Sequence, residues 1–188
     1  FTAICHGEGG GAIIDFCKRI MAGEDYHDIN NLSFQKNGKI VKNPLRPLED
    51  ISAQPIPDYS LFMPERFLRP MGGKVYRCIP IESNRGCPYL CAFCNSPTTL
   101  DMYKGKVEGS FFRKKSIEAI QKELRYLINE WNGEYVYFTS DTFLLFTDKE
   151  FDEFIEMYSG IKIPFWMQTR AETIKLDRMK KLRDVGCF

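Results

Sequence analysis

The sequence predicts an α/β fold whose C-terminal part is built on a parallel sheet. Three strand–helix units follow one another from Val75 to Phe188. In each unit a short run of apolar, aromatic and β-branched residues precedes apolar residues at helical spacing. Consecutive units of this kind form a parallel sheet with right-handed crossovers, as part of a barrel or of a doubly wound sheet. In either architecture the chemistry lies at the carboxyl ends of the strands.

The N-terminal residues predict a strand, a glycine-rich loop and a helix. The apolar run Phe1–Cys5 precedes the loop Gly7-Glu8-Gly9-Gly10-Gly11, and the helical spacing that follows stops at Gly23. Residues 30–42 predict a hairpin, because Asn37-Gly38 between alternating residues is a strong turn signal. This part of the chain is therefore also expected to mix helix and strand.

The next stretch is rich in proline. Six of the ten prolines lie within residues 43–72. Proline fixes φ and removes a hydrogen-bond donor, so this stretch predicts a connector that runs along a surface. The sequence thus predicts a first domain of residues 1–42, a linker of residues 43–74 and a second domain of residues 75–188.

In the second domain, strands are predicted at residues 75–82, 135–139 and 161–168. One helix begins after Ser116, the next begins at the capping box formed by Thr147 and Glu150, and a third ends at Gly186. Pro80 cannot donate to a sheet, so the first strand is expected at a sheet edge. A closed barrel of eight units needs about 250 residues. We therefore expect an incomplete barrel, in a chain that is a fragment of a longer protein.

The composition is that of a globular protein and excludes several classes. Hydrophobic residues make up 44% of the 188 residues, and 26 Lys and Arg against 25 Asp and Glu leave a formal net charge of +1. The balanced charge indicates neither nucleic acid nor an anionic membrane as a partner. Seven cysteines, an odd number without a secretory signal, do not indicate a disulfide framework. They favour a reducing compartment, and we expect a cytoplasmic protein.

Three of the cysteines lie within eight positions, in Cys87-Pro88-Tyr89-Leu90-Cys91-Ala92-Phe93-Cys94, directly after the first strand of the second domain. Three thiolates at this spacing can hold one metal centre from a single loop. Structural zinc needs a fourth ligand, and none stands at a suitable distance. Iron–sulfur centres normally take four cysteines, so three suggest a cubane with one iron open to a group other than protein. Zinc and chance clustering remain the alternatives.

The stretch from Asn84 to Cys94 resembles the CxxxCxΦC loop of the radical S-adenosylmethionine (SAM) superfamily, in which Φ is aromatic. That family carries the loop after the first strand of a partial (β/α) barrel. The resemblance implies that Cys87, Cys91 and Cys94 hold a [4Fe–4S] cluster. It also implies that SAM chelates the open iron through its amino and carboxylate groups, and that Phe93 lies beside the adenine.

The resemblance also implies a reaction. An electron from the cluster cleaves SAM reductively, and the resulting 5′-deoxyadenosyl radical abstracts hydrogen from a small-molecule or peptide substrate. The electron comes from a donor such as flavodoxin or ferredoxin. The cofactors carry this chemistry, and the protein supplies orientation and excludes water.

Polar residues follow the second and third strands. Ser140-Asp141-Thr142 stands where many members of the family carry a Gly-Gly-Glu that holds the SAM ammonium, so the resemblance assigns that role here. Arg170 follows the third strand and could meet the SAM carboxylate as a bidentate donor. Alternatively, Asp141 caps a turn and Arg170 is a surface residue.

The glycine loop of the first domain formally matches a dinucleotide motif, but it lacks the acidic residue at the end of a second strand. With the hairpin and the proline connector, it resembles the end of a cobalamin-binding Rossmann-like domain. The resemblance places Gly7, Glu8 and Gly9 against cobalamin, whereas the alternative is a tight structural turn. Neither His6 nor His27 is predicted as a cobalt ligand.

Together these features resemble a cobalamin-dependent radical SAM enzyme. The chain would comprise the C-terminal end of the cobalamin-binding domain and the first half of the barrel. The expected activity is methyl transfer to an unactivated centre. The alternatives are a methylthiotransferase-like or ring-forming radical SAM enzyme, or a non-catalytic zinc-binding scaffold module.

Overall fold

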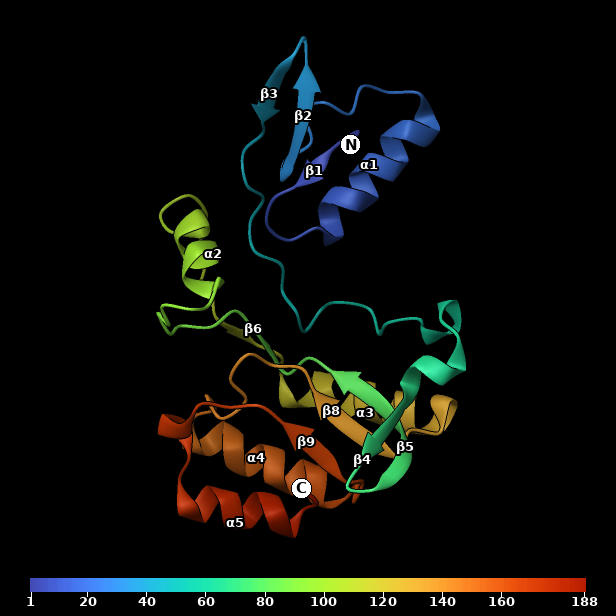
Figure 1. Ribbon diagram of the computed structural model, residues 1–188, viewed down its shortest axis with the longest axis vertical. Coiled ribbons are helices and arrows are strands. Elements are labelled where there is room, and N and C mark those ends of the chain that lie inside the picture. Colours follow the sequence, from blue (N-terminus) through green and yellow to red (C-terminus); the bar gives the residue numbers. More distant parts are fainter. The chain divides into compact units, whose positions relative to one another are not determined.

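The computed structural model describes residues 1–188, which form two compact units (Figure 1). Unit 1 comprises residues 1–49 and 87–111, and unit 2 comprises residues 50–86 and 112–188. The chain therefore enters unit 2, returns to unit 1 for the segment with the three clustered cysteines, and then completes unit 2. The first passage, after Glu49, falls within the stretch predicted as a linker.

Unit 1 contains a three-stranded antiparallel sheet in the order β1-β2-β3. Its elements are β1 (Ile4–Cys5), α1 (Gly10–Ala22), β2 (Leu32–Lys36), β3 (Lys39–Lys42) and α2 (Ser96–Tyr103). The predicted strand, helix and hairpin are confirmed. Gly23 ends α1 with a φ of 69°, and Asn37 and Gly38 form the hairpin turn with φ values of 52° and 75°. Positive φ is accessible to glycine and asparagine, which explains why these residues mark the turns.

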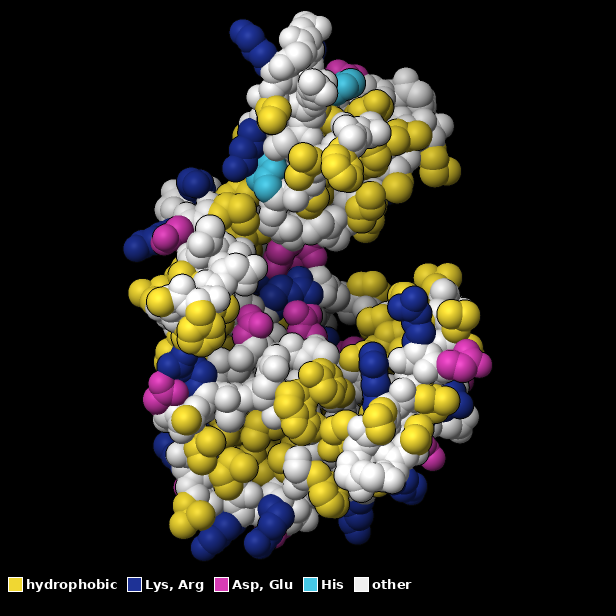
Figure 2. All heavy atoms as spheres, viewed as in Figure 1, with side chains coloured by type: hydrophobic (Ala, Val, Ile, Leu, Met, Phe, Trp, Pro, Cys, Tyr) yellow, Lys and Arg dark blue, Asp and Glu magenta, His cyan; other side chains and the backbone are white.

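The core of unit 1 is small, as expected for so short a unit. Ala12, Ile29, Leu32 and Phe34 are buried, and Phe16 packs against them. Hydrophobic side chains also gather on the surface over α1 (Figure 2), where the residues more than half exposed are Ile13, Ile14 and Met21. Helix α1 therefore shows apolar side chains both to the core and to the surface.

Unit 2 is built on a four-stranded sheet in the order β4-β5-β8-β9. Its strands are β4 (Leu68–Met71), β5 (Lys74–Ile81), β8 (Tyr135–Phe138) and β9 (Phe165–Met167). Strand β4 is antiparallel to β5, and the other pairs are parallel. A further two-stranded antiparallel pair joins β6 (Asn84–Arg85) to β7 (Arg113–Lys114). The three predicted parallel strands are confirmed, although β9 is shorter than expected.

Three helices pack against this sheet, namely α3 (Ile117–Trp131), α4 (Asp148–Ser159) and α5 (Leu176–Asp184). The buried cluster joins Ile79, Val136 and Phe138 of the strands to Leu124 and Phe154 of the helices. Many of its members are aromatic, and the Phe138 and Phe143 rings lie 4.8 Å apart. None of the helices combines the length and the apolar composition needed to cross a bilayer.

The predicted helix boundaries follow from capping. The Ser116 hydroxyl accepts the Ala119 N–H at the start of α3. Thr147 and Glu150 form the predicted capping box of α4, each side chain accepting the backbone N–H of the other. These contacts satisfy backbone donors that the first helical turn leaves without partners.

Part of the stretch predicted as a connector forms regular structure. Residues Tyr59–Leu61 and Pro64–Phe67 form the short 3₁₀ helices η1 and η2, and β4 follows them. A further 3₁₀ turn, η3 (Ala171–Thr173), follows β9. Pro64 opens η2, where a missing N–H costs nothing. Gly72 and Gly73, with φ values of 57° and 81°, turn β4 back onto β5. The prolines therefore shape these elements rather than exclude them.

Pro80 lies in the part of β5 that no longer pairs with β4. Strand β4 pairs with β5 only up to Arg77, so the last residues of β5 form a sheet edge. Ile81 accepts a hydrogen bond from Thr139 of the β8 side, whereas Pro80 faces the opposite side. There the Pro80 carbonyl accepts the Tyr59 hydroxyl at 2.9 Å. The expectation of an edge position holds for this half of the strand, and proline is tolerated because no donor is needed.

The capping box allows a test of local stability. Thr147→Ala removes the hydroxyl that accepts the Glu150 N–H, and we expect the free energy of unfolding to fall by about 1 kcal/mol. Thr147→Ser is the matched control, because it keeps the hydroxyl and should lose less than half as much. Urea unfolding followed by circular dichroism measures both variants. Equal losses would show that the hydroxyl is not what stabilises the helix.

Candidate functional site

The segment with the clustered cysteines is held at both of its ends by the β6–β7 pair. Asn84 pairs with Lys114 and Arg85 with Arg113, directly before Gly86 and after Phe112. The Ser83 carbonyl accepts the Lys115 N–H at 2.8 Å and extends this pairing. Residues 87–111 are therefore an insertion whose two ends are held side by side by this two-stranded pair.

Within this insertion the three cysteines differ in exposure. Cys87 is buried, Cys91 is half-buried and Cys94 is exposed, and none of the three forms a disulfide. The Cys94 N–H donates to the Cys91 carbonyl at 3.1 Å. The Ser96 N–H donates to Cys94 Sγ at 3.4 Å, and the Ser96 hydroxyl donates to the Cys87 carbonyl at 3.4 Å. The first turn of α2 thus organises the loop and provides an amide contact to one sulfur, a contact that tunes iron–sulfur centres.

The donor set decides which inorganic group the loop suits. No group of three or more His, Cys, Asp or Glu side chains converges on one point where a single metal ion could bind. A tetrahedral zinc site needs four ligands that converge on one atom, whereas a cubane offers separate irons to separate thiolates. Three cysteines on one loop, none of them in a disulfide, fit an iron–sulfur cluster by their chemistry. The Phe93 side chain is 94% exposed, so the loop presents an apolar ring to its surroundings.

The glycine loop of unit 1 contacts the end of α2. The Glu8 N–H donates to the Tyr103 hydroxyl at 2.7 Å, and Tyr103 is buried. A Cβ atom at Gly7 would lie 2.2 Å from the same hydroxyl oxygen, and Gly7 has a φ of 93°. Tyr103 and the backbone conformation therefore both require glycine at position 7. The helix that begins beside Cys94 ends against this loop.

Glu8 is tied into unit 1 by further contacts. One of its carboxylate oxygens accepts the Glu49 N–H at 2.9 Å, and its carbonyl accepts the Asn31 side-chain amide at 2.7 Å. Gly9 is the N-cap residue of α1, and a Cβ there would meet Cys5 Sγ at 3.6 Å. The Glu8 carboxylate thus has a structural contact. A role of Gly7, Glu8 and Gly9 in cobalamin binding stays a prediction.

His6 also has structural partners. Its ring nitrogens lie 3.0 Å from the Asn43 carbonyl and 3.1 Å from the Ser33 hydroxyl. These contacts join β1 to the hairpin and to the start of the connector. The His6 side chain therefore links separate segments of unit 1.

In unit 2, the predicted residues after β8 fall into two groups. Ser140 and Thr142 are buried, and the Ser140 hydroxyl accepts the Ser83 N–H at 3.2 Å. The Asn84 amide donates to the Thr142 carbonyl at 3.1 Å. Asp141 between them is exposed. Ser140 and Thr142 therefore join the ends of β5 and β8, and Asp141 is the member of the triplet that is free to meet a ligand.

The Asp141 carboxyl has an unusual electrostatic environment. Desolvation raises its pKa above the usual value, and the nearby Glu82 carboxylate raises it further. Both effects disfavour the charged form of Asp141, and a cation bound beside its carboxylate would favour that form. The end of β8 is therefore suited to a positively charged group.

Glu82, Asn84 and Arg85, which follow β5, were not predicted as site residues from the sequence. Arg85 forms a bidentate ion pair with Glu82, at 2.8 and 2.7 Å, and also donates to Gln54 at 3.0 Å. Asn84 is buried, and its Oδ1 accepts no hydrogen bond. Their place between the first strand and the first cysteine is the signal that could have identified them, since strand ends carry the chemistry of such folds.

Arg170 lies at the end of β9, where it precedes η3. Its guanidinium forms an ion pair with Glu172, and the Arg170 carbonyl accepts the Thr173 hydroxyl at 2.7 Å. The side chain is thus held at the carboxyl end of the third strand. Its predicted contact with the SAM carboxylate stays a prediction.

The arrangement of strand, cysteine loop and further parallel strands defines a class of protein. The chain belongs to the radical SAM superfamily, because residues 81–188 match the model of that family over more than half of the chain. This confirms the resemblance inferred from the cysteine loop. The matched region begins at the last residue of β5 and includes the three cysteines.

Individual relatives agree with this assignment. The chain is 27% identical over 190 residues to an uncharacterized methyltransferase of Pyrococcus horikoshii, covering 98% of this chain and 38% of that protein. The apo structure of OxsB, a cobalamin-dependent SAM radical enzyme, matches 98% of the chain with a TM-score of 0.68 at 19% identity. TsrM from Kitasatospora setae, a radical SAM methyltransferase with cobalamin and a [4Fe–4S] cluster bound, matches 99% with a TM-score of 0.67 at 16% identity.

At these identities the two solved structures establish the fold, which is the α/β fold of radical SAM enzymes. The chain spans 26% of OxsB, 36% of TsrM and 38% of the methyltransferase of Pyrococcus horikoshii. It therefore corresponds to about a quarter to two fifths of the length of these relatives.

The Gly7–Tyr103 contact provides a test within unit 1. We expect Gly7→Ala to lower the free energy of unfolding by about 1–3 kcal/mol more than Gly38→Ala. Both glycines have positive φ, but a Cβ at Gly38 would meet nothing within 4 Å, so Gly38→Ala reports only the backbone strain. Adding Tyr103→Phe to Gly7→Ala should recover part of the loss. Denaturant unfolding measures all three variants, and equal losses for the two glycines would contradict the contact.

Proposed function

We propose that the protein acts as a cobalamin-dependent radical SAM enzyme that transfers a methyl group to an unactivated centre. The observation that carries this proposal is the loop after β5 with three cysteines that form no disulfide, in a chain of this superfamily. The names of OxsB, TsrM and the methyltransferase of Pyrococcus horikoshii support the cobalamin and the methyl transfer.

In this proposal Cys87, Cys91 and Cys94 hold a [4Fe–4S] cluster. The β6–β7 pair fixes the ends of their segment, and α2 supports Cys94 through the amide of Ser96. When bound, the cluster would supply the electron that cleaves SAM to a 5′-deoxyadenosyl radical. The contribution of the chain is to present three thiolates and to leave the fourth iron position without a protein ligand.

Asp141 is proposed to bind the SAM ammonium, because it is exposed at a strand end and its charged form is disfavoured there by desolvation and by Glu82. The buried Oδ1 of Asn84 is a second acceptor and lacks a donor in the structure. A buried acceptor without a partner is costly, and a donor from a bound ligand would remove that cost. Ser140 and Thr142 position Asp141, and Arg170 is proposed to meet the SAM carboxylate. Phe93 would contact the adenine.

Unit 1 is proposed to include the end of the cobalamin-binding domain, with Gly7, Glu8 and Gly9 facing the corrinoid. Glycines allow close approach of a bulky ligand to the backbone. The contact of Tyr103 with this loop fixes the loop conformation before any ligand binds. Cobalamin, when bound, would carry the methyl group.

The proposal includes an electron donor such as flavodoxin or ferredoxin, because the cluster must be reduced before SAM is cleaved. It also includes a cytoplasmic location. This location is proposed because the seven cysteines, an odd number, do not indicate a disulfide framework. The substrate is proposed to be a small molecule or a peptide.

Iron and sulfide analysis tests the cluster. After anaerobic reconstitution we expect about four irons and four sulfides per chain. Cys91→Ser should lose most of this iron, whereas Cys17→Ser, at an exposed thiol of α1, should retain it. Added SAM should change the electron paramagnetic resonance spectrum of the reduced protein. One zinc per chain without sulfide would instead establish a zinc-binding scaffold and overturn the proposal.

The pH dependence of SAM binding tests Asp141. Its raised pKa means that protonation begins at a higher pH than for an ordinary aspartate. Because the protonated carboxyl carries no charge, SAM affinity should fall as the pH is lowered from 7 to 5. Asp141→Asn should bind SAM about tenfold more weakly at pH 7 and lose this dependence. Asp177→Asn, at an exposed position of α5, is the control. Unchanged affinity in Asp141→Asn would exclude the role, and calorimetry measures each constant.

A further inference from the structure

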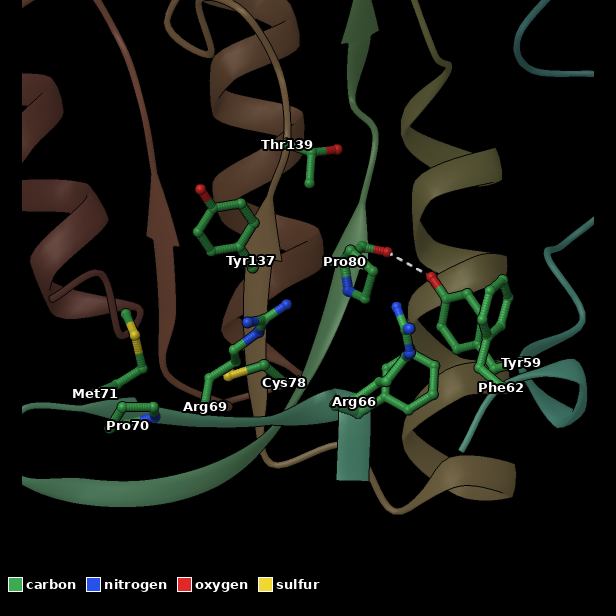
Figure 3. A pocket seen from close by; sticks show the side chains of 11 residues that line it. Tyr59, Phe62, Arg66, Arg69, Pro70, Met71, Cys78, Pro80, Tyr137 and Thr139 are labelled. Carbon is green, nitrogen blue, oxygen red and sulfur yellow. Dashed lines mark hydrogen bonds between the residues drawn. The ribbon is translucent and has the colours of Figure 1, made fainter. Parts of the chain in front are cut away.

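A cavity of about 630 Å³ lies on the open face of the unit 2 sheet, opposite the helices. Its floor is formed by β5 and β8, and its lower wall by η1, η2 and β4 (Figure 3). Every residue that lines it belongs to unit 2. The volume lies in the range of sites that bind small molecules. None of the ligands proposed above has been assigned to this cavity.

The polar part of the lining is cationic. Arg66 of η2 and Arg69 of β4 both extend toward Pro80, between Tyr137 on one side and Phe62 on the other (Figure 3). Neither guanidinium has an acidic partner, and the lining contains no Asp or Glu. By contrast, Arg85 after the end of β5 is paired with Glu82. Two unpaired guanidinium groups at one cavity point to an anionic ligand.

Arg69 lies close enough to Cys78, on the cavity floor, for its charge to affect that thiol. Burial raises the pKa of the Cys78 thiol, and the positive charge of Arg69 partly opposes that rise. Cys78 itself is 4% exposed, and it lies beside Pro80 on the same face of β5. The positive charge of Arg69 therefore acts on Cys78, a residue of the cavity floor.

The rest of the lining is apolar and largely aromatic. Tyr137 presents its ring to the cavity and stacks on Trp166 at 4.7 Å with an angle of 15° between the ring planes. Phe67 and Tyr59 form a second pair on the other side, with ring centres 4.8 Å apart. The Tyr59 hydroxyl is used by the Pro80 carbonyl, which holds that ring in place. Flat rings that are already packed offer a surface for another ring at little entropic cost.

We propose that this cavity binds a small aromatic molecule that carries a carboxylate or phosphate group. The ring lies against Tyr137, and the oxyanion meets Arg66 and Arg69. A guanidinium binds either anion with two parallel hydrogen bonds, so both chemistries fit. The assignment of this ligand as the substrate rests on the proposed function, whereas its binding does not.

The probes that test the site are 1-naphthylacetate, 1-naphthyl phosphate and the neutral 1-naphthylacetamide. Isothermal titration of the protein, without SAM or reductant, should give one site on which an anion binds at least about tenfold tighter than the amide. The tighter of the two anions identifies which oxyanion the site prefers. Equal affinity for the amide and for both anions would overturn the proposal.

Variants locate the binding. Arg69→Gln and Arg66→Gln should each weaken anion binding about tenfold and leave amide binding unchanged. The unchanged amide also shows that the variants are folded. Arg183→Gln, which removes an exposed charge from the end of α5, is the control and should bind the anions as the parent does. Anion binding that survives both cavity substitutions would place the ligand elsewhere.

A separate assay distinguishes this inference from the proposed function. Formation of 5′-deoxyadenosine from SAM is measured in the reduced protein without added probe. If anions bind but SAM is not cleaved, the cavity inference stands and the proposed function fails. If SAM is cleaved but the anions bind no tighter than the amide, the cavity inference alone fails.

Discussion

The parallel pairing of β5 with β8 is the constraint on which the rest of unit 2 depends. It aligns Ile81 with Phe138, so the chain leaves both strands at the same level. The residues that follow then bond to each other. The Ser83 N–H donates to the Ser140 hydroxyl, and the Asn84 side-chain amide donates to the Thr142 carbonyl. The same alignment buries Phe138 in the aromatic core and turns Tyr137 to the open face. One set of backbone hydrogen bonds thereby positions the acidic strand end, the start of the cysteine segment and the floor of the cavity.

Unit 1 depends on a second set of contacts that is local to a few polar residues. Asn31 is 1% exposed and links the Glu8 carbonyl to the Arg46 N–H. Glu49 accepts the Gly11 N–H at the start of α1. The apolar core here is small, so satisfied buried polar groups carry much of the order. Tyr103 adds the end of α2 to this network, and through α2 the conformation of the glycine loop is linked to that of the cysteine loop.

Much of the fold could be predicted because its signals are local. Ser116, Thr147 and Glu150 cap helices by contacts within one turn, and Asn37-Gly38 forms its turn alone. Helix α2 was not predicted, because Ser96–Tyr103 shows no apolar stripe and only Tyr103 of it is buried. Strand β4 was not predicted either, since Pro70 argues against a strand unless it lies at an edge. Both elements exist because of partners that are distant in sequence.

The sequence by itself determined the family, the cysteine loop and its place after the first parallel strand, because spacing and residue type along the chain carry that information. Only the tertiary structure decided which members of Ser140-Asp141-Thr142 are exposed, why residue 7 must be glycine, and that Arg66 and Arg69 share a cavity with Tyr137. These properties depend on the distance between side chains from separate elements. A linear pattern does not specify such distances, since they are set by sheet register and by packing.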